Sequence, residues 1–232
     1  MTWKEVFTSS IGKKIIMSLT GIFLVLFLIV HVGINACIFA DLFDPLDDGA
    51  MFNKAAHFMG STVLIRILEV GLFAGIFLHI AQGLMLEASN RSKRKQGYAV
   101  ALGQKGSPWY SRAMGLLGTL ILLFLILHLA HFWVKARITG VEPTLVDGKD
   151  MHDMFGLMKV TFSEAWVVIV YILGCISLAY HLLHGFQSAF RTLGLGNNRW
   201  MTMVQNIGIG YSVLVPLLFA IMPVAMYMGW VS

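Results

Sequence analysis

Five apolar stretches, each longer than about 20 residues, are the feature that most limits how this chain can fold. They cover residues 15–40, 62–88, 113–134, 165–190 and 207–230. A helix of about 20 apolar residues spans the hydrocarbon core of a bilayer, so each stretch predicts one membrane-spanning helix. The sequence therefore predicts an all-α integral membrane bundle of five transmembrane helices.

The composition excludes a water-soluble enzyme. Of the 232 residues, 57% are hydrophobic and 12% are charged, whereas about 25% of the residues of an ordinary soluble domain are charged. The stretches and their loops use the whole length, so we expect a single transmembrane domain over 1–232. Two cysteines, Cys37 and Cys175, are too few for a disulfide scaffold, and neither begins a Cys-x-x-Cys-His motif.

Basic residues concentrate before the first stretch and in the second and fourth loops. Eleven of the seventeen lie there: Lys4, Lys13, Lys14, Arg91, Lys93, Arg94, Lys95, Lys105, Arg112, Arg191 and Arg199. Lys and Arg favour the cytoplasmic side of membrane proteins, so we expect a cytoplasmic amino terminus and an outer carboxyl terminus. This distribution explains the net charge of +5, and no nucleic-acid partner is expected.

Histidines are unusually frequent inside the apolar stretches. Six of the eight lie there: His31, His79, His128, His131, His181 and His184. An ionisable side chain inside a membrane is costly, and it normally faces the bundle interior and has a partner. One such histidine could simply be neutral and hydrogen-bonded to a neighbouring helix, but each of the first four stretches carries at least one. This distribution indicates a common role.

Counting from the cytoplasmic basic residues predicts two levels of histidines. His31 and His128 each lie 16 or 17 residues beyond such a residue, roughly 24–26 Å from the inner edge of the membrane. His79 and His184 are expected roughly 10–18 Å from that edge. We call His31 with His128 the outer pair, and His79 with a histidine of the fourth stretch the inner pair. Two histidines at one level on different helices suit bis-histidine ligation of a haem, so the sequence predicts two b haems.

Two choices stay open from depth alone. His131 would lie roughly 4–5 Å above His128, so matching its level to His31 favours His128 in the third stretch. Depth does not decide between His181 and His184 in the fourth. The histidine left over in each stretch is expected to form a hydrogen bond at a helix interface or at a haem edge.

Other metal sites and a proton relay fit the sequence less well. A zinc or di-iron site needs three or four ligands at one level, and no Glu-x-x-His motif occurs within a stretch. A proton relay would usually include buried acids, and Glu69 is the one clear acid well inside a stretch. The two-haem interpretation is therefore favoured. From a different class, a transporter whose histidines bind a substrate or protons stays open as an alternative.

Two glycines support this interpretation weakly. Gly21 and Gly118 each stand ten residues before an outer-pair histidine, at the level expected for the inner haem. A missing side chain there would let the macrocycle approach the backbone. Ordinary packing of small residues between membrane helices explains each glycine equally well.

Several motifs, taken in order, resemble a known family. The first stretch contains Ser18-Leu19-Thr20-Gly21 before His31, the third has Arg112-Ala113-Met114 and Gly118 before His128, and the fourth has His184-Gly185 before Arg191. On five stretches, this order resembles the di-haem cytochrome b membrane anchor of succinate dehydrogenases and fumarate reductases, in its single-polypeptide form. The resemblance covers essentially the whole chain.

The resemblance implies a set of cofactor residues and partners. It implies His31 with His128 on the outer haem and His79 with His184 on the inner haem, with Ser18 and Arg191 near the inner propionates. It also implies an electron-transfer subunit of the bacterial cytoplasmic membrane that docks a flavoprotein and an iron-sulfur subunit on the cytoplasmic side. Its redox partner within the membrane is a quinone, expected to be menaquinone. This chain itself is not expected to act on succinate or fumarate.

Sites for the partners are expected at both ends of the bundle. The basic residues at 91–95 with Trp109 and Trp200 are candidates for subunit docking, although a solvated inner face explains the charges equally well. Asn35, Arg66 and Glu69 are candidates for the quinone site, and the last two could instead form an interfacial ion pair. Some relatives carry a Glu, implicated in proton transfer, where this chain has Leu182, so that route is in doubt. A related alternative is a haem b anchor for another dehydrogenase, such as a hydrogenase.

Overall fold

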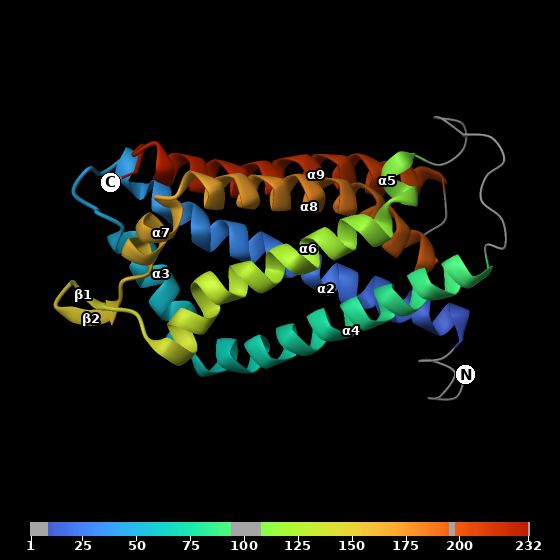
Figure 1. Ribbon diagram of the computed structural model, residues 1–232, viewed down its shortest axis with the longest axis horizontal. Coiled ribbons are helices and arrows are strands. Elements are labelled where there is room, and N and C mark those ends of the chain that lie inside the picture. The colour runs from blue at the N-terminus through green and yellow to red at the C-terminus, as the bar shows by residue number, and fades with distance from the viewer. Residues whose placement is uncertain (1–8, 94–107, 195–197, 232) are drawn as a thin grey trace. The chain divides into compact units, whose positions relative to one another are not determined.

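The computed structural model describes residues 9–93, 108–194 and 198–231. Within them five long α-helices follow one another along the chain (Figure 1): α2, Ser10–Ala36; α4, Val63–Lys93; α6, Met114–His128; α8, Ala165–Thr192; and α9, Asn198–Tyr227. Each belongs to a helical segment that is long and apolar enough to cross a membrane. The prediction of five such helices in a mainly helical chain is confirmed, whereas a short β-hairpin departs from the expected all-α fold.

The helices do not begin and end where the apolar stretches do. α2 begins at Ser10 rather than at residue 15, and beyond Ala36 it continues as the 3₁₀ helix η1, Cys37–Leu42. α9 begins at Asn198 rather than at residue 207. Hydropathy marks the part of a helix that prefers hydrocarbon, whereas backbone hydrogen bonding continues into polar sequence at its ends.

The third long helix changes its winding after His128. It passes into two π-helical segments, η2 (Leu129–Trp133) and η3 (Lys135–Thr139). π-helical turns are rare and occur frequently at functional sites. Because a π turn holds more residues than an α turn, the side chains beyond His128 face directions that α-helical counting does not predict.

The chain divides into two compact units, and every long helix contributes to both. Unit 1 comprises Met1–Leu26, Leu72–Leu122 and Ser177–Val213, and unit 2 comprises Phe27–Gly71, Leu123–Ile176 and Leu214–Ser232. The outer pair therefore falls within unit 2. His79 falls within unit 1 together with both histidines of α8.

Unit 1 is held together by packing between segments of four helices. Phe186 of α8 packs against Tyr211 of α9, with ring centroids 5.8 Å apart. The hydroxyl of Tyr211 donates to the backbone carbonyl of Val25 in α2 at 2.7 Å. Leu117 of α6 is buried. These contacts give the unit an apolar interior in which a histidine side chain is shielded from water.

Unit 2 carries a short β-hairpin that the sequence analysis does not predict. β1, Pro143–Val146, pairs antiparallel with β2, Lys149–His152. The two residues between them, Asp147 and Gly148, have φ angles of 50° and 73°. Positive φ at both turn residues is typical of a type I′ turn, for which Asp-Gly is a favoured sequence. That dipeptide is the signal from which the hairpin could have been predicted.

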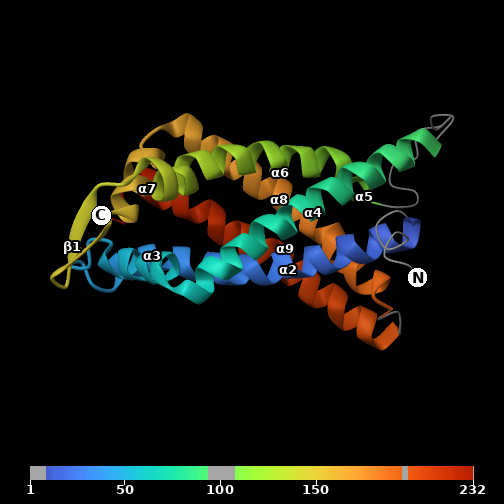
Figure 2. The ribbon, with the colours of Figure 1, turned by 90° about the horizontal axis from the view of Figure 1, so that it is seen from below.

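The hairpin lies together with two short helices, α3 (Ala50–Ser61) and α7 (Met154–Phe162), in a group that we call the cap (Figures 1 and 2). Both helices lie in segments that the sequence analysis treats as loops. A salt bridge of 2.7 Å between Lys54 and Asp147 joins α3 to the turn of the hairpin. This hydrogen-bonded carboxylate raises the pKa of Lys54.

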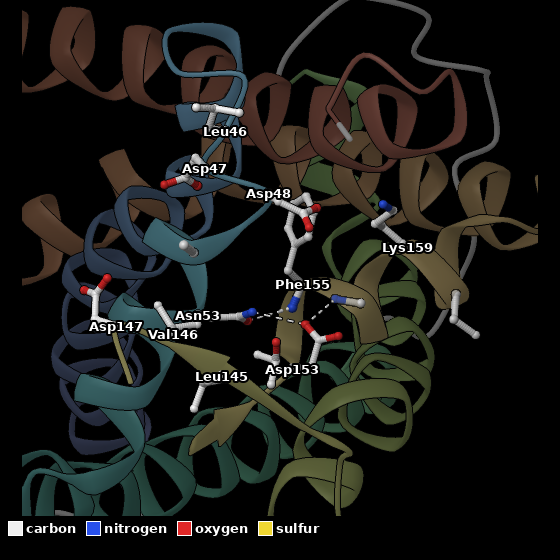
Figure 3. Close-up of a pocket in the computed structure, with 14 residues that line it drawn as sticks. Leu46, Asp47, Asp48, Asn53, Leu145, Val146, Asp147, Asp153, Phe155 and Lys159 are labelled. Carbon is white, nitrogen blue, oxygen red and sulfur yellow. Dashed lines mark hydrogen bonds between the residues drawn. The ribbon is translucent and has the colours of Figure 1, made fainter. Parts of the chain in front are cut away.

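The buried amide of Asn53 connects α3 to the start of α7. Its Nδ2 donates to Asp153 Oδ1 at 3.1 Å, and its Oδ1 accepts from the backbone N–H of Phe155 at 2.9 Å (Figure 3). Asp153 also caps α7 by accepting from the N–H of Gly156. Gly49, with φ of 72°, precedes α3, and a Cβ there would collide with the Phe155 ring. The cap is thus fixed by specific polar contacts beside an open cavity of about 540 Å³.

Candidate metal centres

The outer pair meets in unit 2. The imidazole rings of His31 in α2 and His128 in α6 lie 5.8 Å apart between centroids, with their planes at 83°. Phe27 stacks on His31 at 5.2 Å, and Phe219 of α9 lies 5.4 Å from it. The structure thus brings the two outer-pair residues together in an aromatic setting.

His131 faces a different partner from His128. Its Nδ1 lies 3.1 Å from the hydroxyl of Tyr171 in α8, and the two rings stack with an interplanar angle of 4°. Phe124 stacks on His128 at 5.7 Å. The structure therefore separates the two histidines of the third stretch: His128 stands against His31, and His131 is hydrogen-bonded to Tyr171.

In unit 1 the imidazole that stands against His79 is that of His181. Their ring centroids lie 6.2 Å apart, with the planes at 65°. A Cβ added at Gly21 of α2 would lie 3.5 Å from Cε1 of His79, and one added at Gly118 of α6 would lie 3.8 Å from Cε1 of His181. The two glycines expected beside the inner haem therefore line this pair of rings, and a larger side chain at either position would extend toward them.

His184 is hydrogen-bonded elsewhere. Its Nδ1 lies 2.7 Å from the hydroxyl of Ser111, which belongs to the short helix α5, Trp109–Arg112. Residues three apart on an α-helix point about 60° away from one another, so His181 and His184 face different neighbours. The resemblance implies His79 with His184, whereas the ring that the structure places against His79 belongs to His181.

Each pair contains one imidazole nitrogen that is buried without a protein partner. Within the described part of the chain, the buried side-chain polar atoms that lack a hydrogen bond are Nδ1 of His128, Nδ1 of His181 and Oε1 of Gln82. An unsatisfied buried polar atom costs about 1–3 kcal/mol, and it calls for an explanation such as an ion or a ligand. Imidazole is a common metal ligand through either ring nitrogen, so a metal bound through Nδ1 would give each of these two atoms a partner.

The spacing of the rings fits one metal ion between two imidazoles. An imidazole nitrogen lies about 2 Å from a metal that it ligates, so the centroids of two such rings on opposite sides of an ion lie about 6 Å apart. The measured separations are 5.8 and 6.2 Å. Among residues 9–93, 108–194 and 198–231, no three His, Cys, Asp or Glu side chains converge to hold a metal. Two nitrogen donors per centre suit an iron that carries its other ligands in a macrocycle.

Glu69 is occupied by an ion-pair cluster in unit 2. One carboxylate oxygen accepts from Trp133 Nε1 at 2.6 Å, and the other accepts from Arg66 at 2.9 Å and from Arg137 at 3.2 Å. Arg137 also donates to the backbone carbonyl of Gly60 at 3.2 Å. The expected contact between Arg66 and Glu69 is present, and Trp133 and Arg137 extend it across to the π-helical segments. These bonds join α4 to the end of the third long helix, and we call this cluster the clasp.

The remaining candidate residues are Asn35, Ser18 and Arg191. Asn35 contacts the outer pair: its Nδ2 donates to the backbone carbonyl of His31 at 2.8 Å and lies 3.3 Å from Nδ1 of the same residue. Ser18 is buried, and its hydroxyl donates to the carbonyl of Lys14 at 2.8 Å. Arg191 is exposed at the end of α8.

The expected docking surface is described only in part. Trp109 and Trp200 are half exposed, and Arg91 pairs with Glu87 at 2.6 Å. Arg94 and Lys95 lie outside the described residues. Leu182 is buried in unit 1.

Comparison of the chain with protein-family models, with curated proteins and with solved structures finds no match. A functional assignment therefore depends on the sequence pattern and on the geometry of the two histidine pairs. Both point to His31, His79 and His128, and they differ in the fourth histidine, which is His184 by the resemblance and His181 by the ring geometry.

Proposed function

We propose that this chain is a multi-pass membrane protein that binds two b haems and carries electrons between a quinone and soluble redox subunits. The observation that carries the proposal is the pair of facing imidazoles in each unit, at 5.8 and 6.2 Å. The five helices of membrane-spanning length and apolar character support the location. More specifically, we propose that the chain is the anchor subunit of a succinate dehydrogenase or fumarate reductase in the bacterial cytoplasmic membrane.

The residues of this chain would hold the cofactors and control their surroundings. His31 and His128 would supply the axial nitrogens of the outer haem, and His79 and His181 those of the inner one. A bound haem supplies reversible one-electron chemistry. Phe27 and Phe124, stacked on the outer pair, exclude water from it, and burial of this kind is one of the protein's means of setting a haem potential.

The choice of His181 as the second inner ligand rests on contacts. Its ring stands against His79, Gly118 leaves space beside it, and its Nδ1 lacks a protein partner. The Ser111 hydroxyl contacts Nδ1 of His184, which is compatible with a metal at its Nε2, so the choice depends on which ring stands against His79. We therefore propose His181 for this role, with the His184 assignment of the resemblance as the alternative that mutagenesis must decide.

A quinone would exchange electrons with the outer haem and protons with a polar side chain. Oxidation of a quinol releases two electrons and two protons, so the site needs a proton acceptor within hydrogen-bond reach. Of the candidates, Asn35 touches the outer pair and would orient a quinone oxygen by hydrogen bonding. Glu69 is bound by Trp133 and two arginines, so it would accept a quinol proton only if these bonds broke. Arg66 would stabilise negative charge there.

The proposal places the dicarboxylate chemistry outside this chain. A flavoprotein subunit and an iron-sulfur subunit would dock at the basic cytoplasmic face, where the half-exposed Trp109 and Trp200 offer apolar contacts. Electrons would pass through this chain between those subunits and the quinone pool. Leu182 has no proton to transfer, so proton movement by that position is not part of the proposal.

Haem stoichiometry is the direct test. We expect a pyridine haemochrome assay of the purified protein to give two b haems per chain, and reduced-minus-oxidised spectra to show b-type bands. A preparation without these bands would contradict the proposal and leave a histidine-dependent transporter as the better account. Two haems together with co-purified molybdenum or nickel-iron subunits would retain the electron carrier but reject the succinate or fumarate assignment.

A further inference from the structure

Thr20 faces the inner pair, although the sequence analysis assigns it no role. Its hydroxyl oxygen lies 3.1 Å from Nδ1 of His79, across the contact between α2 and α4 within unit 1. The same oxygen lies 2.7 Å from the backbone carbonyl of Ile16 and 3.2 Å from that of Met17. The neighbouring Gly21 has no side chain, which lets this part of α2 approach the imidazole.

The chemistry of these contacts decides the direction of each hydrogen bond. A threonine hydroxyl has one proton to donate and two lone pairs to accept with. The carbonyls of Ile16 and Met17 can only accept, so the hydroxyl proton is directed to the nearer of them, Ile16, at 2.7 Å. In that arrangement the oxygen meets Nδ1 of His79 with a lone pair, and that nitrogen carries the proton. In a neutral imidazole this leaves Nε2 unprotonated and able to bind a metal.

We propose that Thr20 is a positioning residue for His79: it fixes the Nδ1–H tautomer and lowers the reduction potential of the inner haem. A metal-bound imidazole commonly donates its second N–H to an acceptor, which fixes its orientation and increases its basicity as a ligand. A more basic axial ligand favours the oxidised iron, so the potential falls. This inference rests on the proposed function, because it requires a haem at the inner pair.

The other histidines show that this contact is specific to one ligand. Nδ1 of His181 has no protein partner, so the two proposed ligands of the inner haem are not equivalent. Near His31 the neighbouring atom is Nδ2 of Asn35 at 3.3 Å, and an amide N–H₂ is a donor rather than an acceptor. The effect of Thr20 should therefore be confined to the inner haem.

The test compares two substitutions of Thr20 in the full complex. Thr20→Val keeps the shape of the side chain and removes the hydroxyl, whereas Thr20→Ser retains it. Thr119→Val is a matched control, since the Thr119 hydroxyl makes a similar hydrogen bond to the carbonyl of Gly115 at 2.8 Å but faces outward. The readout is the midpoint potential of each haem in a spectroscopic redox titration, with the inner component identified by its loss in His79→Ala.

We expect the inner potential to rise in Thr20→Val and to stay at its original value in Thr20→Ser and Thr119→Val, with the outer potential unchanged in all three. Selective loss of the inner haem in Thr20→Val, with retention in Thr20→Ser, would also support the inference. An unchanged inner potential in Thr20→Val would overturn it, and so would loss of the inner haem in both Thr20 variants, because the hydroxyl would then not be the cause. A parent protein without haem would instead refute the proposed function.

Discussion

Substitution of the two α8 histidines by alanine tests the inner pair most directly. His181→Ala removes the ring that lies 6.2 Å from His79, leaving that centre with one imidazole. The outer pair shares no residue with it and belongs to the other unit. We therefore expect the variant to retain one of two haems, so the reduced b-type absorption per chain should fall by about half.

His184→Ala is the matched substitution, because it removes an identical side chain three residues away on the same helix. The Ser111 hydroxyl loses its 2.7 Å contact, at a cost of about 0.5–1.5 kcal/mol in stability, but no proposed ligand is lost. We expect both haems to remain. The assay is the pyridine haemochrome content per purified chain, together with an EPR spectrum in which each low-spin ferric haem gives its own signal.

The reverse result would refute this reasoning. If His184→Ala lost one haem and His181→Ala kept two, the facing rings of His79 and His181 would not mark the ligands, and the assignment by resemblance would stand. Loss of one haem in both variants would mean that the bond between Ser111 and His184 is itself required to hold the inner centre. Ser111→Ala should then have the same defect.

Three further predictions follow from contacts outside the ligands. Gly118→Leu should deplete the inner haem, because the new side chain would extend toward the His181 ring. Gly71→Leu should not, since a Cβ there meets no atom within 4 Å. The haem content per chain measures both effects. Asn53→Ala should destabilise the cap by about 2 kcal/mol, because two buried hydrogen bonds are lost. The measurement is amide hydrogen exchange, which should become faster in α3 and α7. Unchanged exchange would mean that apolar packing alone holds the cap. Glu69→Gln should weaken the interaction of residue 69 with Trp133 Nε1. A fluorescence spectrum of Trp133 identical to that of the original protein would contradict the cluster.

The long helices could be predicted because a single property, about 20 consecutive apolar residues, is sufficient to specify each one. The cap could not be predicted in the same way. Its helices are short, and their stability depends on tertiary contacts such as the bonds of Asn53, whose partners lie about 100 positions away in the sequence. The hairpin had a local signal in Asp147-Gly148, but a two-residue turn is easily overlooked between long hydrophobic segments.

The histidine pairs could be predicted as far as depth along a helix determines them. Counting residues gives height at about 1.5 Å per residue, and this was enough to select His31, His79 and His128. Which way a side chain points also depends on how the helices are rotated about their axes. That rotation decides which of His181 and His184, less than one turn apart, faces His79. It cannot be obtained by counting residues along a single helix.

Helix winding adds a second reason why direction was harder to predict than depth. The π-helical segments that follow His128 turn Trp133 and Arg137 toward Glu69, where α-helical spacing alone suggests only a local pair with Arg66. His131, which lies in the first of these segments, stands against Tyr171. The contacts of Trp133, Arg137 and His131 therefore all lie within the two π-helical segments at the end of this helix.

The two pairs share an asymmetry that follows from their hydrogen bonds. In each, the histidine from the earlier helix has a polar neighbour at Nδ1, Asn35 for His31 and Thr20 for His79, and the histidine from the later helix has none. The earlier ring is therefore oriented by protein contacts before any metal binds. On the proposed function, the later ring would gain a partner for its buried imidazole only from the cofactor, so in the haem-free protein its side chain should be the more mobile of the two. Histidine NMR relaxation on the haem-free and loaded forms would reveal that difference, and equal mobility of both rings in the haem-free form would contradict it.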